Sequence, residues 1–431
     1  MSFDAKYIHS SLQNAKRPEL ARILSGVWKI SLSEYSSSLW ERTSEPPPLE
    51  LEMRQAFETE FCRIGFTEEQ AQMYCTELER TRVLQTATHL TASEGPTFLA
   101  LHNLALLGLP QGETYFVGSY SGVPFANAAW SGCLNFSNQI DLESVISEHA
   151  PGFAELKRAD NDRIRDSSDK RISLIPGKMR DVRVFQSRIP EKMADLMTHF
   201  SEPILRISPK AKTGDDFTKW ASQFCTNQLG KIFPSKSIIY FDLNEVISNY
   251  LALVIANSNH PIHRLFFDDA ARDSVFAVFP SDTTFFTVDV KYKNKMRQES
   301  VVLIGNELHS QNYKLKLNQE NLINEIKSGA LCPGLFLGFT ALSFINEFIC
   351  FGSFEQVEYL AEFKQKWLKL DLLDNEVVHK SNTSAFTSGR CLDESGEGIH
   401  PLDLLLGMEI KFDENQTIGE LMKPLLSRLL S

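Results

Sequence analysis

A loop rich in side chains that can bind a ligand or transfer a proton lies between Thr86 and Pro96. The ordinary pKa of a histidine is near neutral, so His89 can act as a donor or as a general acid or base. Glu94 can bind an amine or take a proton from one. The loop also offers hydroxyl groups and a glycine to a polar ligand, at Thr86, Thr88, Ser93 and Gly95. This set of residue types suits acid–base chemistry on a small polar metabolite.

Each of these residues also has a purely structural interpretation. Thr86 can satisfy the end of a strand, and His89 can be a loop residue bonded to the backbone. Glu94, beside Gly95-Pro96, can stabilise the start of the next helix, because the first turn of a helix favours negative charge. His102 lies inside the apolar run that follows, where we expect a core histidine with hydrogen-bond partners.

The elements around the loop predict a βαβ unit. Residues 82–109 have the pattern of a strand, a polar loop and an apolar helix, and Pro110-Gln111-Gly112 forms a turn before a second strand at 113–118. A right-handed crossover over about 35 residues places two such strands in one parallel sheet. Ser119 follows the second strand, and we include it among the ligand-binding candidates.

A second junction between a strand and a helix contributes further candidates. An apolar stretch at 342–351 leads through Gly352 to a helix at 356–370. The glycine lets a ligand approach the backbone closely, and Glu355 is either a helix cap or a ligand contact. Because the carboxyl ends of parallel strands share one edge, we expect the 86–96 loop and the 351–355 junction to line one crevice. The binding candidates of this junction are Gly352, Ser353 and Glu355.

Helical and strand patterns alternate along the whole chain, with interruptions. Further expected elements are helical stretches at 18–39 and 50–82, strands at 180–185 and 237–242, helices at 215–229, 243–256 and 318–328, and antiparallel strands at 274–292 and 299–305. This order predicts an α/β fold: a Rossmann-like, mostly parallel sheet interrupted by insertions, with a helical N-terminal arm. The expected divisions are the arm at 1–80, the first part of the core at 81–139, an insertion at 140–210, and the second part of the core at 211–431 with a β insertion near 274–305.

Composition excludes several classes of partner. The 431 residues carry a formal net charge of -11, and no basic patch of the kind that nucleic acid requires dominates the sequence. The mixed-charge stretch 157–171 is interpreted as a solvated loop, with a phosphate-binding arm as the alternative. No apolar run reaches the roughly 18 residues of a membrane span, and the first residues lack a leader pattern, so we expect a cytoplasmic protein. The seven scattered cysteines indicate reduced thiols that mostly pack in the core.

The strong cofactor motifs do not occur. There is no phosphate loop, no dinucleotide fingerprint, no His-Glu-x-x-His and no paired-cysteine zinc pattern, so the cofactor is unknown and no metal is indicated. The stretch 118–122 has the spacing of a serine nucleophile elbow, but its central residue is Tyr120. A small-molecule substrate is the expected partner, and the oligomeric state is not indicated.

Two stretches resemble the putative cysteine ligase family that completes bacillithiol synthesis. The 86–96 loop is similar to that family's T-G-Q-Q-x-x-x-x-T-G-P loop, with Thr86, Gly95 and Pro96 at matching positions. Residues 331–335 and 351–360 are similar, in the same order, to its S-P-x-x-L-x-R-P block and its G-G-P-x-E-x-x-Y-W segment. The resemblance covers roughly residues 84–370 with large gaps, and it implies a Rossmann-like core broken by connecting insertions.

The departures from the family limit what the resemblance implies. Thr88 and His89 stand where the family has paired glutamines, Glu94 stands where it has a threonine, and residues 119–125 replace its E-D-H-D-F segment. The cysteine and sugar-malate substrates are therefore not carried over. The resemblance implies a ligase or transferase that forms an amide or C–N bond between a small polar metabolite and an amino acid or activated acyl group, with His89 and Glu94 as catalytic candidates. The alternative is a non-catalytic small-molecule-binding protein on the same scaffold.

Overall fold

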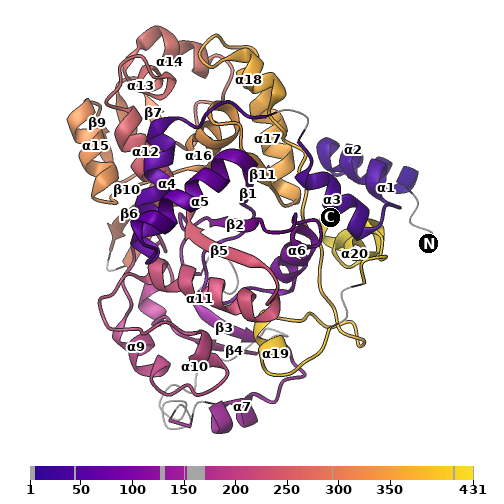
Figure 1. Cartoon of the computed structure of the whole chain (residues 1–431). Coiled ribbons are helices and arrows are strands. Elements are labelled where there is room, and N and C mark those ends of the chain that lie inside the picture. Colours follow the sequence, from indigo (N-terminus) through magenta and orange to yellow (C-terminus); the bar gives the residue numbers. More distant parts are fainter. Residues whose placement is uncertain are drawn as a thin grey trace.

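A four-stranded parallel sheet lies at the centre of the chain (Figure 1). The computed structural model describes residues 5–42, 45–126, 132–149, 151–152, 170–293, 295–410 and 413–430. The strands lie in the order β11-β1-β2-β5, and β1 runs parallel to both of its neighbours. Their bounds are β1 (Val83–Gln85), β2 (Thr114–Ser119), β5 (Ser237–Asp242) and β11 (Ile349–Phe351). The α/β class and the parallel sheet agree with the expectation.

The sheet separates two hydrophobic cores, because alternate side chains of each strand point to opposite faces. Val83 and Val117 belong to the core that contains helices α6 (Pro96–Leu107) and α11 (Phe217–Ile232). Leu84 and Phe116 belong to the other core, which contains α4 (Leu51–Ile64) and α12 (Leu243–Val254). Burial on both faces explains why these strands are almost continuously apolar.

The N-terminal region is helical, and each of its two expected stretches forms more than one helix. The helices are α1 (Ala5–Asn14), α2 (Pro18–Val27), α3 (Leu32–Trp40), α4 and α5 (Glu68–Thr81). Gly65, at a φ of 115°, ends α4 in a left-handed conformation that favours glycine. Thr67 then begins α5 with a capping box to Gln70.

A second, antiparallel sheet has five strands in the order β10-β6-β7-β8-β9. They are β6 (Phe286–Tyr292), β7 (Lys295–Ile304), β8 (Glu307–His309), β9 (Lys314–Lys316) and β10 (Leu331–Pro333). The expected strand at 274–292 begins too early, because residues up to Phe276 belong to α14 (Asp269–Phe276), which Asp268 caps with its side chain. Helices α13 (Pro261–Phe267) and α15 (Gln319–Lys327) flank this part of the chain.

The region between β2 and α11 is built from short elements. They are β3 (Cys133–Phe136), α7 (Leu142–His149), β4 (Lys170–Ser173), the 3-10 turn η1 (Gly177–Met179), α9 (Glu191–Met197) and α10 (Ile204–Ile207). The strand expected at 180–185 is wrong: Arg183 forms only an isolated bridge to Pro124, and its guanidinium donates to the Thr287 and Gly329 carbonyls. Most of the mixed-charge stretch 157–171 lies outside the described residues.

The apolar stretch at 342–351 is mostly helical, and only its last three residues form a strand. Helix α16 (Leu335–Phe339) continues as the π-helical η2 (Thr340–Ile345) before β11. Periodicity cannot distinguish a buried helix from a buried strand in such a run. The chain then continues as α17 (Phe354–Trp367), α18 (Asn375–Lys380), α19 (Pro401–Leu405), α20 (Ile418–Met422), η3 (Lys423–Leu425) and α21 (Leu426–Leu429).

Among the described residues, none of the helices combines the length and the apolar character that a membrane crossing requires. Five of the seven cysteines are buried, as expected, whereas Cys133 is partly exposed and Cys62 is exposed.

Candidate functional site

The two segments predicted to form one crevice lie side by side at the carboxyl ends of β1 and β11. Gln85 is in register with Phe351, and the Thr86 N–H donates to the Phe351 carbonyl over 3.1 Å. The Gln356 side-chain amide donates to Thr86 Oγ1 over 2.8 Å. The parallel pairing therefore brings the 86–96 loop against the start of α17. We predicted this from the sequence because each segment follows a strand of the same parallel sheet.

The hydroxyl residues of the loop are buried, and those other than Ser93 form hydrogen bonds within the protein. Thr88 Oγ1 lies 2.6 Å from Ser119 Oγ, which connects the loop to the end of β2. A C-terminal segment, residues 385–400, covers the loop: the Thr387 N–H donates to the Gly352 carbonyl, and the Cys391 N–H donates to the Pro96 carbonyl. Ser93 is also buried, and its Oγ has no hydrogen-bond partner among the described residues. These groups are close together, but they face the protein interior.

Glu94 belongs to a closed network inside the core. Its carboxylate accepts from the Tyr240 hydroxyl over 2.8 Å and lies 2.8 Å from His102 Nε2, and the residue is 1% exposed. His102 Nδ1 lies 3.0 Å from the Tyr115 hydroxyl. Burial raises the pKa of both tyrosines well above its usual value, and the charge of Glu94 adds to this. His102 is thus the core histidine with partners that the sequence predicted.

His89 differs from Glu94, because one of its ring nitrogens is not used. Its backbone is held by pairing with Tyr120: the Tyr120 N–H donates to the Thr88 carbonyl, and the Leu90 N–H donates to the Tyr120 carbonyl. Its Nδ1 is buried and has no hydrogen-bond partner among the described residues. Burial lowers the pKa of His89, so the imidazole is neutral at neutral pH. A neutral imidazole with a free nitrogen can bind an amine or hydroxyl group.

The residues after β11 have mainly structural partners. Gly352 packs so closely on Gln356 that an added Cβ atom would lie 2.8 Å from that side chain. Gly95 and Ser353 are the N-cap residues of α6 and α17, and neither makes a side-chain cap. Glu355 is 60% exposed and forms an ion pair with Arg17 over 2.7 Å, so the structure places it against the N-terminal helices.

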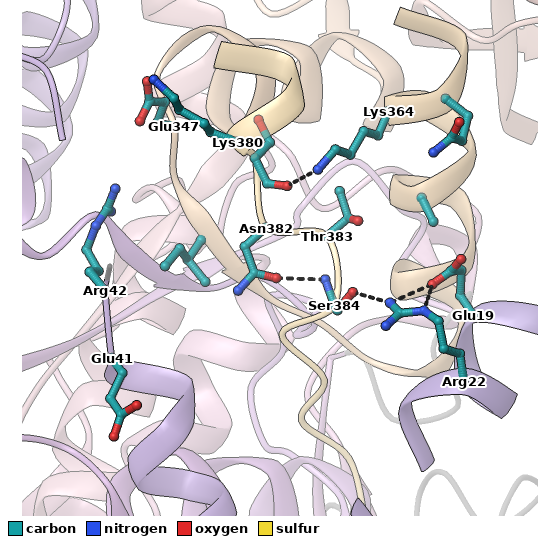
Figure 2. Close-up of a pocket in the computed structure, with 14 residues that line it drawn as sticks. Glu19, Arg22, Glu41, Arg42, Glu347, Lys364, Lys380, Asn382, Thr383 and Ser384 are labelled. Atoms are coloured by element: carbon teal, nitrogen blue, oxygen red, sulfur yellow. Dashed lines mark hydrogen bonds and ion pairs between the residues drawn. The ribbon is translucent and has the colours of Figure 1, made fainter. Parts of the chain in front are cut away.

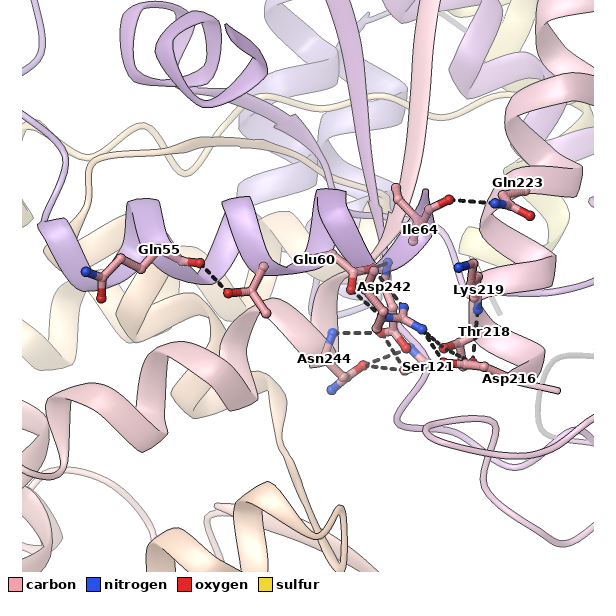
Figure 3. A network of polar contacts seen from close by, with 12 residues as sticks. Gln55, Glu60, Ile64, Ser121, Asp216, Thr218, Lys219, Gln223, Asp242 and Asn244 are labelled. Carbon is pink, nitrogen blue, oxygen red and sulfur yellow. Dashed lines mark hydrogen bonds and ion pairs between the residues drawn. The ribbon is translucent and has the colours of Figure 1, made fainter. Parts of the chain in front are cut away.

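A second group of polar residues, which the sequence did not single out, lies at the carboxyl ends of β2 and β5 (Figure 3). Asp242 ends β5 and accepts from Ser121 Oγ over 2.6 Å. The Asp242 N–H donates to Glu60 of α4 over 2.8 Å. Asn244 Oδ1 accepts the Ser121 N–H over 2.7 Å, so the ends of the two strands are joined. Ser119 and Ser121 therefore connect this group to the 86–96 loop through Thr88.

Arg63 holds the acidic side of this group together. Its guanidinium donates to both carboxylate oxygens of Glu60, over 2.6 and 2.9 Å, and to Asp216 Oδ2 over 2.5 Å. Glu60 and Asp242 are fully buried, whereas the side chains of Arg63 and Asp216 are 21% and 25% exposed. Solvent thus reaches one side of the cluster, which we call the Arg63 cluster: Glu60, Arg63, Asp216, Asp242 and Glu245.

Arg63 alone does not neutralise the four carboxyl groups of the cluster, and this imbalance shifts the pKa values of those groups. Burial, with the charges of Glu245 and Glu60, raises the pKa of Asp242 well above its usual value. Burial raises the pKa of Glu245 to about 7 against the attraction of Arg63. Asp216 is also desolvated, but Arg63 and backbone donors outweigh this and lower its pKa. Glu245 is 8% exposed, so the cluster presents a carboxyl group that exchanges a proton near neutral pH.

The sequence contains a signal for part of this cluster. Asp242 is the last residue of a buried strand and Glu245 lies three positions later, which is the same placement that singled out the 86–96 loop. Glu60 and Arg63 lie in the middle of a helix and have no local signal. In the part of the chain that the structure describes, no group of three or more His, Cys, Asp or Glu side chains is arranged to hold a metal ion.

Neither the known protein families nor the curated proteins contain a match to this chain. The resemblance to the bacillithiol-synthesis ligases therefore stays a prediction.

Proposed function

We propose that this chain is an enzyme of the ligase or transferase type, built on a Rossmann-like core, that joins a small polar metabolite to an amino acid or activated acyl group through an amide or other C–N bond. The observation that carries the proposal is Glu245, a nearly buried carboxyl group with a pKa of about 7 at the carboxyl end of β5. A group that is half ionised at neutral pH suits the proton transfer that C–N bond formation requires.

The proposed reaction uses Glu245 as a general base. The amine nitrogen attacks the carbonyl carbon of the acyl group, and the C–N bond forms. The Glu245 carboxylate takes the proton from the nitrogen, and the bond between the carbonyl carbon and its leaving group breaks with the electron pair on that group. Asp242 and Arg63 act as positioning residues, because their contacts hold the start of α12 against α4.

The 86–96 loop supplies the ligand-binding part of the proposed site. Thr88 bonds to Ser119 over 2.6 Å, and Ser121, two residues later, bonds to Asp242 over 2.6 Å. The loop and the Arg63 cluster thus meet at the end of β2. His89, with its unused Nδ1, is the loop residue that we assign to ligand binding.

Mass-spectrometric profiling tests this proposal. The purified chain is incubated with a polar metabolite extract, ATP and a mixture of amino acids, and products are compared with those of Glu245→Gln and Glu320→Gln. Glu320 is an exposed first-turn glutamate of α15, so its variant is a matched control for the first-turn Glu245 of α12. A new C–N-linked product is expected from the wild type and the control, and its absence from all samples contradicts the proposal.

A specific observation favours a second candidate, a small-molecule-binding protein without catalysis. Both carboxylate oxygens of Glu94, a predicted catalytic residue, form hydrogen bonds inside the core, and residues 385–400 cover the loop. Native mass spectrometry distinguishes the two candidates: retention of one unchanged ligand per chain, without turnover, supports the binding protein.

A further inference from the structure

A cavity of about 650 Å³ lies along the outer edge of β11 (Figure 2), and no residue of the Arg63 cluster lines it. It is bordered by α2, by the residues after α3, by α17 and by residues 380–384. Its wall includes Ile349, the first residue of β11, whereas the junction described above follows the last residue of that strand. The volume lies within the range of about 300–1,000 Å³ that is typical of small-molecule sites.

The wall of the cavity is polar, and its charged side chains have both signs. Among the described residues that line it, the only apolar ones are Ile349 and Ala361 and none is aromatic, so a nucleobase or other flat ring has no described side chain to stack on. Asn382, Thr383 and Ser384 offer amide and hydroxyl groups along one side (Figure 2). These groups suit the hydroxyls of a polyhydroxylated ligand.

Two half-buried cations of the wall, Arg42 and Lys364, form no ion pair with the described residues. Among the described residues, no carboxylate lies within 4.0 Å of the Arg42 guanidinium or of Lys364 Nζ. Arg42 approaches only the Thr81 carbonyl, at 3.5 Å, and Lys364 donates to the Ser381 carbonyl over 2.7 Å. Figure 2 places the two cations on different sides of Asn382.

The other two cations of the wall differ, because both have carboxylate partners. Arg22 pairs with Glu19 over 2.8 Å, and Lys380 lies 3.7 Å from Glu376. Burial lowers the pKa of both Arg42 and Lys364, and at Arg42 the negative charge of Glu347 offsets part of this change. An anion in the cavity attracts both side chains and offsets the cost of their burial.

We propose that this cavity is a binding site for a small polyhydroxylated anion, whose phosphate or carboxylate group is attracted to Arg42 and Lys364 and whose hydroxyls face Asn382, Thr383 and Ser384. The site is separate from the proposed reaction site, so a ligand here acts as an effector or as a carried metabolite. Glu19, Glu41 and Glu347 also line the cavity; Glu19 pairs with Arg22, whereas Glu41 and Glu347 oppose the anion.

Isothermal titration calorimetry with glucose 6-phosphate and with gluconate tests the proposal. Saturable one-to-one binding of either compound supports it, and the one that binds identifies the anionic group as phosphate or carboxylate. Glucose, which has hydroxyls but no charge, is expected to bind at least about tenfold more weakly, and added salt is expected to weaken binding of the anion. If neither anion binds, or if glucose binds equally well, the proposal is wrong.

Variants locate the site. Arg42→Gln and Lys364→Gln are each expected to weaken binding about tenfold, whereas Lys327→Gln, on the exposed last turn of α15, leaves it unchanged. Glu347→Gln removes an opposing charge and is expected to strengthen binding two- to threefold, which is a gain that a misfolded variant does not show. Binding that none of the three cavity variants alters would place the anion elsewhere and overturn the assignment.

Discussion

Gln356 donates its side-chain amide to Thr86 Oγ1 over 2.8 Å, although 270 positions separate the two residues in the sequence. The contact joins the first turn of α17 to the end of β1. The chain leaves β1 towards β2 on one side, and β11 lies on the other side. Ligands of open α/β sheets bind where the strand order reverses in this way, outside the carboxyl ends of the strands. The pair therefore holds together the two segments that border the proposed site.

Replacement of Gln356 by alanine is expected to lower the free energy of unfolding by about 1–2 kcal/mol, because Thr86 and two β11 carbonyls lose a buried donor. Urea denaturation measures the change. Gln365→Ala, at an exposed position of the same helix, is the control and is expected to change stability by less than about 0.5 kcal/mol. Equal effects of the two variants would show that the buried contact adds nothing.

Glu94→Ala is expected to destabilise the chain by about 2–3 kcal/mol, since it removes the carboxylate that bonds both Tyr240 and His102 in the core. Glu94→Gln keeps a hydrogen-bonding group of the same shape and is expected to cost less. Thermal unfolding of the two variants checks the order. A Glu94→Ala variant as stable as the wild type would mean that Glu94 is not part of the core network.

His89→Ala is expected to weaken ligand binding or turnover about tenfold with little loss of stability, because Nδ1 has no partner among the described residues to lose. His309→Ala, at an exposed position in β8, is the control. Binding and thermal unfolding are measured on the same preparations. A large loss of stability with unchanged binding would assign His89 to packing alone.

The raised pKa of Glu245 predicts a pH dependence of stability. Because the folded-state pKa is about 7 and the ordinary value is 4.5, the folded chain binds more protons than the unfolded chain between these values. The stability contributed by this group is therefore complete below about pH 4.5 and is lost as the pH rises through about 7. Asp242, whose pKa is also raised, contributes in the same direction.

Urea denaturation of wild type and Glu245→Gln at several pH values from about 5 to about 8 tests this pH dependence. The wild type is expected to lose more stability than Glu245→Gln as the pH rises. Glu320→Gln is expected to follow the wild type. Parallel curves for wild type and Glu245→Gln would show that Glu245 titrates at its ordinary pKa.

The parallel sheet was predictable because its strands are short, apolar and separated by helical patterns. The strand at 237–242 has the expected bounds, and the strand expected at 113–118 lies at 114–119. The convergence of the 86–96 loop with the 351–355 junction also followed from the parallel arrangement. The helical character of 335–345 did not, since a continuously apolar run carries no periodicity that separates helix from strand.

The Arg63 cluster as a whole and the cavity beside β11 were not predictable, because each is assembled from distant segments. Glu60 meets the backbone of Asp242 across 182 positions, and Arg63 reaches Asp216 across 153. Nothing local in α4 marks Glu60 as buried, since a glutamate in an amphipathic helix usually faces solvent. Only the packing of α4 against the strand ends converts these residues into an acid–base group.

The pH dependence of product formation tests most directly whether Glu245 is the general base. With the C–N-linked product identified, initial rates are measured across neutral pH for wild type, Glu245→Gln and Glu320→Gln. A general base at Glu245 predicts a wild-type rate that rises with pH around a midpoint near 7, an unchanged profile for Glu320→Gln, and a loss of at least about a hundredfold in Glu245→Gln. A Glu245→Gln variant with the wild-type rate and pH profile would contradict a general-base role for Glu245.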